Sequence, residues 1–439
     1  MQRVLLLTAS VLVLVLVAVV PPASAKKLVI PASSAPGPDR FDRVTAWTYG
    51  PPKAKTVLVI VPGTSGGAGS VAPVAKDLAA RVSGLQVWAL DRREEAFEDQ
   101  SRFRSGTREQ AKDYYLGLKF KQPKGASFVA GWGLAVQTAD IRAVVRRASA
   151  GGTRKVVLGG HSRGASQAAA YAAWDFGGRP GYRDLAGLVL IDGGLLGFIG
   201  NGEKQPYTPA TARKAVADAR KQPFNDIIGL GIPAIAQIFG QLVGTYATQA
   251  PDAASAIQDE PIVPANLKPE FRVTNEAFFG TIFDKTYSPA GFEGLRTRSG
   301  ALAESGDPRA WISGERTPIE RLSKAFSALD PDFTEWYFPQ RLIIDVAAAN
   351  PMRRDAASTA LGLRLFHTPE IDTPLYAFQT DLTNGRVLAG ARRLVGRSNI
   401  RTTRLVSDPG MSHIDPVVGS PKRNTFLRTV VPFLRKLTR

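Results

Sequence analysis

Apolar runs alternate with amphipathic stretches along this chain, and their order predicts its fold class. Residues 56–61 form a continuous β-branched and apolar run, which is typical of a strand buried on both faces. Residues 71–82 repeat apolar side chains at helical spacing and end at Ser83-Gly84. The same alternation recurs downstream and predicts an α/β fold with a mostly parallel sheet and crossover helices. The predicted strands are residues 44–49, 56–61, 85–90, 155–159, 188–191, 375–378 and 403–406, and the predicted helices are 71–82, 138–148, 165–174, 209–221, 387–395 and 425–437.

A long segment between residues 192 and 374 lacks repeating strand signals. A connection of this size has to carry structure of its own. Within it, residues 227–243 are strongly apolar, but Pro233, Gln237 and Gln241 interrupt the run. We therefore expect a buried helix there rather than a membrane span.

The first 25 residues have the pattern of a secretory signal peptide. Arg3 precedes an apolar stretch, and Ala23-Ser24-Ala25 is a small-x-small cleavage site. We expect cleavage after Ala25 and a secreted protein, and a retained N-terminal anchor is the alternative. The chain has no cysteine, so disulfides and thiolate chemistry are excluded.

The formal net charge of +18 is relevant to the kinds of partner that the protein binds. Its basic residues are dispersed and no stacking motif accompanies them, so we expect no nucleic-acid binding. Association with an anionic membrane or wall surface is one interpretation of the charge. A compositional bias toward arginine is the simpler one.

Residues 156–165, VVLGGHSRGA, carry the most informative motif. An apolar strand runs into Ser162, which Gly160 and Gly164 flank, and an alanine-rich helix follows. This is the G-x-S-x-G pattern of a nucleophile on a sharp strand-to-helix turn. Together with a late histidine, it makes the chain resemble the α/β-hydrolase family, over most of its length and in a serine esterase or lipase-like form.

The resemblance implies an α/β-hydrolase fold with a large, mainly helical cap. The core comprises residues 26–192 and 373–439, and the cap is the insertion 193–372. The implied activity is that of an exported serine hydrolase, which cleaves an ester-type bond in a small-molecule or lipid substrate through an acyl-enzyme on Ser162. Serine at this position argues against dehalogenase or epoxide hydrolase chemistry.

The resemblance also implies a histidine base and an acid. His413 follows the last predicted strand and is the expected base, whereas His161 and His367 are expected to be structural. Asp381, after the strand at 375–378, is the expected acid that orients His413. The runner-up is Asp192, after the strand at 188–191. Asp345 and Asp408 are weaker candidates for the acid, and Asp415 is expected to cap the following helix.

Backbone amides of Thr64 and Arg163 are the expected oxyanion donors, with Ser65 as an alternative to Thr64. Their loop opens with Pro62-Gly63, where the family usually has His-Gly.

The remaining patterns indicate no cofactor. No acidic or histidine group has metal-ligand spacing, and no Gly-Lys-Ser/Thr follows the glycine-rich loop, so we expect neither a metal nor a nucleotide. A peptidase or an acyltransferase would use the same residues. A non-catalytic binding protein of this fold is the other alternative.

Overall fold

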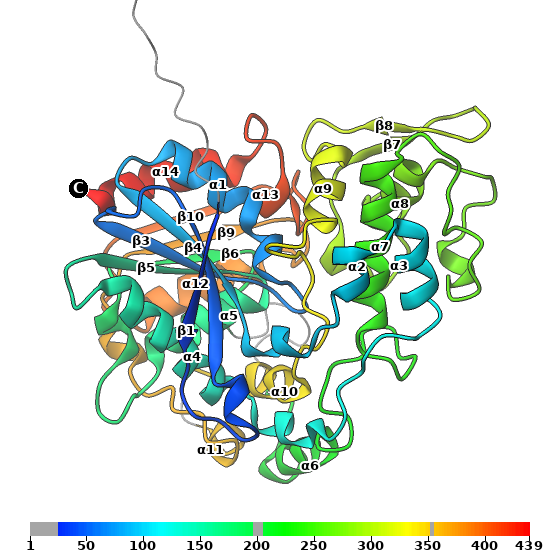
Figure 1. Ribbon diagram of the computed structural model, residues 1–439. Helices are drawn as coiled ribbons and strands as arrows, with labels where there is room; N and C mark the ends of the chain where they lie inside the picture. Colours follow the sequence, from blue (N-terminus) through cyan, green and yellow to red (C-terminus); the bar gives the residue numbers. More distant parts are fainter. Residues whose placement is uncertain (1–24, 196–204, 352–354) are drawn as a thin grey trace, which may run out of the picture.

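An eight-stranded sheet forms the centre of the computed structural model, which describes residues 25–195, 205–351 and 355–439 (Figure 1). The strand order is β1-β2-β4-β3-β5-β6-β9-β10. β2 is antiparallel to both of its neighbours, and every other pair in this sheet is parallel. The predicted α/β class is confirmed. The strands are β1 Lys26–Pro31, β2 Arg43–Tyr49, β3 Thr56–Val61, β4 Leu85–Asp91, β5 Lys155–His161, β6 Gly187–Ile191, β9 Leu375–Gln379 and β10 Thr403–Ser407.

Helices cover both faces of the sheet because its central strands are apolar on both faces. In β3, Leu58 and Ile60 pack into one core with α1 Ala72–Arg81 and α14 Thr425–Thr438. Val57, Val59 and Val61 pack into the other core with α4 Leu134–Ser149 and α5 Arg163–Ala173. Another helix on the core, α12 Arg386–Gly396, follows β9.

The segment between β6 and β9 lies mostly beside the sheet, drawn in green and yellow in Figure 1. Its helix α7 begins after Pro233, later than the sequence pattern predicts, because proline cannot continue a helix from the preceding turn. None of the helices in the described ranges is both long and apolar enough to cross a bilayer. The elements of this insertion are α6 Pro209–Ala219, α7 Ile235–Gln249, α8 Asn275–Phe283, β7 Gly300–Leu302, β8 Trp311–Ser313, α9 Ile319–Phe326, α10 Gln340–Ala348 and α11 Ala356–Ala360.

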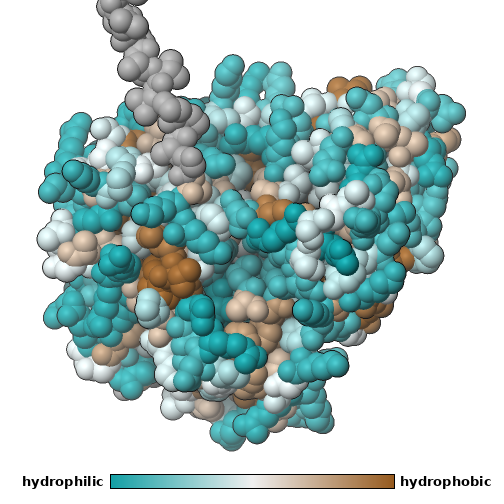
Figure 2. All heavy atoms as spheres, in the orientation of Figure 1, coloured by the Kyte–Doolittle hydropathy of each residue, from teal (hydrophilic) through white to brown (hydrophobic). Residues whose placement is uncertain are grey.

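Among the elements that lie where the sequence pattern predicts none, three precede the insertion. The edge strand β1 has no continuous apolar run, and α2 Ser101–Ser105 and α3 Arg108–Tyr115 are short and polar. The predicted signal peptide falls almost wholly on residues 1–24, outside the described residues. The face shown in Figure 2 is mostly hydrophilic, with separated apolar patches.

Candidate active site

Ser162 stands between β5 and α5 in a strained backbone conformation, with φ 56° and ψ −123°. This conformation costs a non-glycine residue free energy and is typical of functional turns. The turn is tight, since a Cβ on Gly160 would overlap the Gly164 backbone and one on Gly164 would overlap the Val61 carbonyl. The amide of Ser162 donates to the Ile191 carbonyl of β6 at 2.9 Å. The G-x-S-x-G motif therefore forms the sharp strand-to-helix turn that its sequence predicts.

A buried histidine–carboxylate pair lies at the same end of the sheet. His413 Nδ1 and Asp192 Oδ2 are 2.6 Å apart, and the two side chains are 2% and 0% exposed. Thr380, at the end of β9, donates its amide to Asp192 Oδ1 at 2.8 Å and its hydroxyl to Oδ2. Burial acts to raise the pKa of Asp192, but the bonds from His413 and Thr380 outweigh burial and lower it. Asp192 is thus a carboxylate that holds one ring nitrogen of His413.

Asp381 is not the carboxylate bonded to His413, although the sequence predicts it in that position. Its side chain forms ion pairs with Lys285 and with Arg298, the latter at 3.5 Å, and both partners belong to the insertion. The prediction that Asp381 holds His413 is wrong, and the runner-up Asp192 takes that position. The physical reason is the end of β9: Thr380, one residue earlier, faces the site, and Asp381 turns away from it.

His161 precedes Ser162 in the sequence, and its ring packs against His413. Its Nε2 lies 2.9 Å from the His413 carbonyl, and the two ring centroids are 4.5 Å apart. Burial first, and then the neighbouring His413, lowers the pKa of His161 to about 3. A neutral His161 therefore positions the backbone of His413. His367 lies elsewhere, between Asp175 and Glu370.

The loop 62–67 lies against the serine, since a Cβ on Gly63 would stand 3.5 Å from Ser162 Oγ. The Thr64 amide donates no hydrogen bond within the described residues, and Arg163 is the first residue of α5, where an amide has no helical partner. Both predicted donors are thus unengaged. In addition, Arg163 Nε donates to Thr64 Oγ1 at 2.9 Å and ties the two segments together.

Arg92 fixes the shape of this loop, a role that its Asp-Arg-Arg sequence context does not reveal. Its guanidinium donates to the carbonyls of Pro62, Gly63 and Gly66, and it forms a buried ion pair with Glu335 at 2.5 Å.

Residues 332–335 of the insertion also hold the loop. Gly67 N donates to Phe333 O at 2.9 Å, Gly69 N to Asp332 O at 2.8 Å, and Glu335 N to Ser65 O at 3.0 Å. We call these three main-chain bonds the seam. Ser65, within it, has a φ of 51°.

The weaker acid candidates are engaged elsewhere. Asp345 accepts from Arg341 and the Leu134 amide, and Asp408 pairs with Arg316. Asp415 is the first residue of α13 Asp415–Val418 rather than its cap. Its carboxylate accepts from the amides of Ser412, at 2.6 Å, and Arg298, so that it braces the turn carrying His413.

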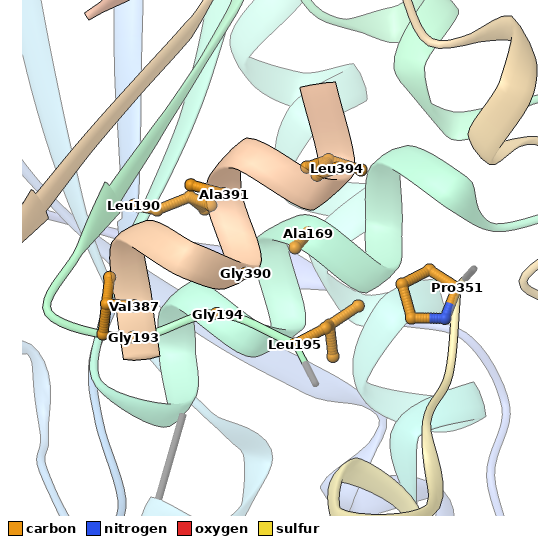
Figure 3. A pocket seen from close by; sticks show the side chains of 10 residues that line it. All are labelled: Ala169, Leu190, Gly193, Gly194, Leu195, Pro351, Val387, Gly390, Ala391 and Leu394. Atoms are coloured by element: carbon orange, nitrogen blue, oxygen red, sulfur yellow. The ribbon is translucent and has the colours of Figure 1, made fainter. Parts of the chain in front are cut away.

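A small apolar pocket lies beyond Asp192, between the start of the insertion and α12 (Figure 3). The cavity volume is about 20 Å³, enough for one or two water molecules. It is too small for an ester substrate. Its lining residues are Ala169, Leu190, Gly193, Gly194, Leu195, Pro351, Val387, Gly390, Ala391 and Leu394.

Comparison with known proteins identifies the fold of this chain. No model of a protein family matches the chain, and no curated protein sequence matches it. A candidate lipase from Sulfolobus solfataricus aligns with a TM-score of 0.53 and 16% identity over 94% of each chain. This likeness shows that the chain has an α/β-hydrolase fold.

Two further solved structures align less closely. For an esterase from Thermogutta terrifontis, the TM-score is 0.44 and the identity 14%, over 94% of this chain and 100% of the other. For epoxide hydrolase A from Mycobacterium thermoresistibile, the values are 0.45 and 15%, over 94% and 98%.

Proposed function

We propose that this protein is a serine hydrolase that cleaves ester-type bonds through an acyl-enzyme on Ser162. The observation that carries the proposal is the strained turn at Ser162 beside the 2.6 Å pair of His413 and Asp192. A serine hydroxyl is a weak nucleophile on its own and needs an adjacent base. The candidate lipase with this fold supports the ester substrate class.

In the proposed reaction, Ser162 Oγ attacks the carbonyl carbon of the ester and its proton passes to His413 Nε2. Asp192 keeps the other ring nitrogen protonated and stabilises the imidazolium that forms. The amides of Thr64 and Arg163 donate to the developing oxyanion. His413 then returns the proton to the leaving alcohol. A water molecule, activated by the same histidine, releases the acyl group from Ser162.

Labelling with a fluorophosphonate probe tests the nucleophile. The wild-type protein should be labelled at Ser162 and should hydrolyse p-nitrophenyl esters, and Ser162→Ala should lose both properties. The matched control is Ser149→Ala, because Ser149 ends α4 and its hydroxyl only bonds the preceding turn. A labelled and active Ser162→Ala protein would refute the proposal.

We further propose that the protein is exported with cleavage after Ala25. The first strand of the sheet, β1, begins at Lys26, so this cleavage would leave the fold intact. N-terminal sequencing of the protein recovered from the medium of its native host should begin at Lys26. A cell-retained protein that begins at Met1 would contradict export.

A further inference from the structure

Six carboxyl groups gather near the Gly67 end of the loop 62–67, whose Gly63 end lies against Ser162. They come from the end of β4, from the short helix Arg93–Phe97 that follows it, from the turn after that helix, and from residues 332–335 of the insertion. We call them the acid cluster: Asp91, Glu94, Glu95, Glu98, Asp332 and Glu335.

The acid cluster has too few positive partners. Arg92, paired with Glu335, is the one cationic side chain bonded to it among the residues the structure describes. Lys27 and Arg104 act on it only at longer range. Burial and mutual repulsion raise the pKa of Glu95 and Glu98 well above the usual range. With one bonded guanidinium for six acids, ionisation of the whole cluster would leave a deficit of positive charge, which is costly in a shielded site.

Three oxygens in the cluster are shielded from solvent and have no hydrogen-bond partner among the described residues. They are Oε1 of Glu95 and Oε1 of Glu335, the latter on a side chain that is 0% exposed, and a third such oxygen is Oε2 of Glu94. No hydrogen bond from the described residues reaches either oxygen of Glu95. The charge of Glu335 also acts on Glu95, and that of Asp91 acts on Glu335. Buried polar atoms are rarely left without a partner, and such atoms call for an explanation.

The positions of three of these carboxylates offer an explanation for the oxygens without partners. Asp91, Glu95 and Asp332 each offer one carboxylate oxygen, and the three oxygens lie within 4.8 Å of one another. Gly67 borders the same spot, since a Cβ there would stand 3.3 Å from Glu95 Oε1 and 3.5 Å from Asp332 Oδ1. Trp47 Nε1 and the Ala68 amide donate to Asp91, and they hold it in place while leaving lone pairs free.

We propose that Asp91, Glu95 and Asp332 bind one Ca²⁺ ion. Ca²⁺ takes six to eight oxygen ligands at about 2.3–2.6 Å, so three oxygens of this spacing fit on one ion. An all-oxygen ligand set disfavours Zn²⁺, which takes nitrogen and sulfur ligands. The ion would need further ligands, which water entering beside Glu95, the one partly exposed residue of the three, would supply. The sequence predicts no metal site because Asp332 is far from the other two ligands in the chain.

The proposed ion would join three parts of the molecule. Asp91 ends the core strand β4, Asp332 belongs to the seam, and Gly67 closes the loop that carries the Thr64 amide. Calcium binding would therefore stabilise the attachment of the insertion to the core. Because it is measured by metal binding and unfolding, this proposal can fail or succeed independently of ester hydrolysis.

The test uses the full chain, stripped with EDTA and then titrated with CaCl₂ in a calorimeter. One Ca²⁺ should bind per chain, and the midpoint of thermal unfolding should rise by several degrees with the ion. Glu95→Gln should weaken Ca²⁺ binding at least tenfold and remove the rise. Without calcium, this variant should unfold at the wild-type temperature or above it, because it removes a repelling charge and breaks no bond.

Glu304→Gln is the matched control, since Glu304 is an exposed acid of the insertion, and it should bind Ca²⁺ like the wild type. A second measurement needs no variant of the cluster. Trp47 is bonded to Asp91 at 2.6 Å, so Tb³⁺ in the site should emit when tryptophan is excited, and Ca²⁺ should displace it. The proposal is overturned if the stripped wild type binds no Ca²⁺, if Glu95→Gln binds it as tightly, or if Tb³⁺ gives no tryptophan-sensitised emission.

Discussion

Asp192 and Glu95 of the acid cluster both have carboxyl oxygens shielded from solvent, yet their pKa values shift in opposite directions. Asp192 accepts hydrogen bonds from His413 and from both donors of Thr380, and its pKa is lowered. Glu95 accepts none from the described residues, and its pKa is raised well above the usual range. Burial is common to both, so the supply of donors decides which acid stays ionised. The first arrangement holds a histidine, and the second favours protonated acids unless the proposed ion is bound.

Removing the charge of Asp192 should give the largest effect. Asp192→Asn should lower kcat/KM for a p-nitrophenyl ester by about 10³–10⁴-fold, because the amide no longer fixes the tautomer of His413. Asp381→Asn is the matched control and should stay within about threefold of the wild type, since the Asp381 carboxylate pairs with Lys285 and Arg298 of the insertion. If Asp381→Asn lowered kcat/KM more than Asp192→Asn, Asp381 would be the acid that orients His413.

Breaking the one ion pair of the acid cluster should come next. With EDTA present, Arg92→Leu should lower the free energy of unfolding by about 3–5 kcal/mol, because Glu335 is left buried without its partner. The double variant Arg92→Leu/Glu335→Leu should recover part of this loss. Urea unfolding monitored by tryptophan fluorescence measures both. Equal stability of the single variant and the wild type would mean that Glu335 is neutral in the fold.

His161 should make the protein sensitive to acid. Its pKa is about 3 in the fold and about 6.5 in an unfolded chain, so the unfolded state takes up the proton first. Its stabilising contribution is therefore present above about pH 6.5 and is lost as the pH falls toward 3. Between pH 7 and 4.5, His161→Gln should lose less free energy of unfolding than the wild type, with a difference on the order of 2 kcal/mol. Equal losses for the two proteins would contradict a neutral, buried His161.

Removing a cation next to Asp381 should give the smallest effect. Lys285→Met should change the free energy of unfolding by less than about 1 kcal/mol, because the Lys285 side chain is 37% exposed and Arg298 still faces Asp381. Thermal unfolding and kcat/KM should both stay close to the wild-type values. A loss of activity as large as that of Asp192→Asn would place Asp381 in the reaction after all.

Local patterns predicted the parts of the structure that local chemistry determines. The run 56–61 coincides with β3, and the elbow at Ser162 follows from two small glycines between an apolar strand and an alanine-rich helix. His413 was found because few histidines exist and its loop follows the last strand. In each case the signal lies within about ten neighbouring residues.

The identity of the acid could not be settled in that way. Asp192 and Asp381 both follow apolar strands, and the choice depends on which residue at the end of β9 faces His413, a matter of one residue in strand register. The cluster of Asp91, Glu95 and Asp332 was missed for a related reason. One of its members arrives from the insertion, and no spacing rule for neighbouring ligands covers that distance.

The seam has a consequence for how substrate reaches Ser162. Its three main-chain bonds attach residues 332–335 of the insertion to the loop that presents the Thr64 amide. Moving the insertion away from the core at this point would distort that loop. In the proposed hydrolase, a motion that admits an ester would therefore take place at another contact between the insertion and the core, while this one stays anchored.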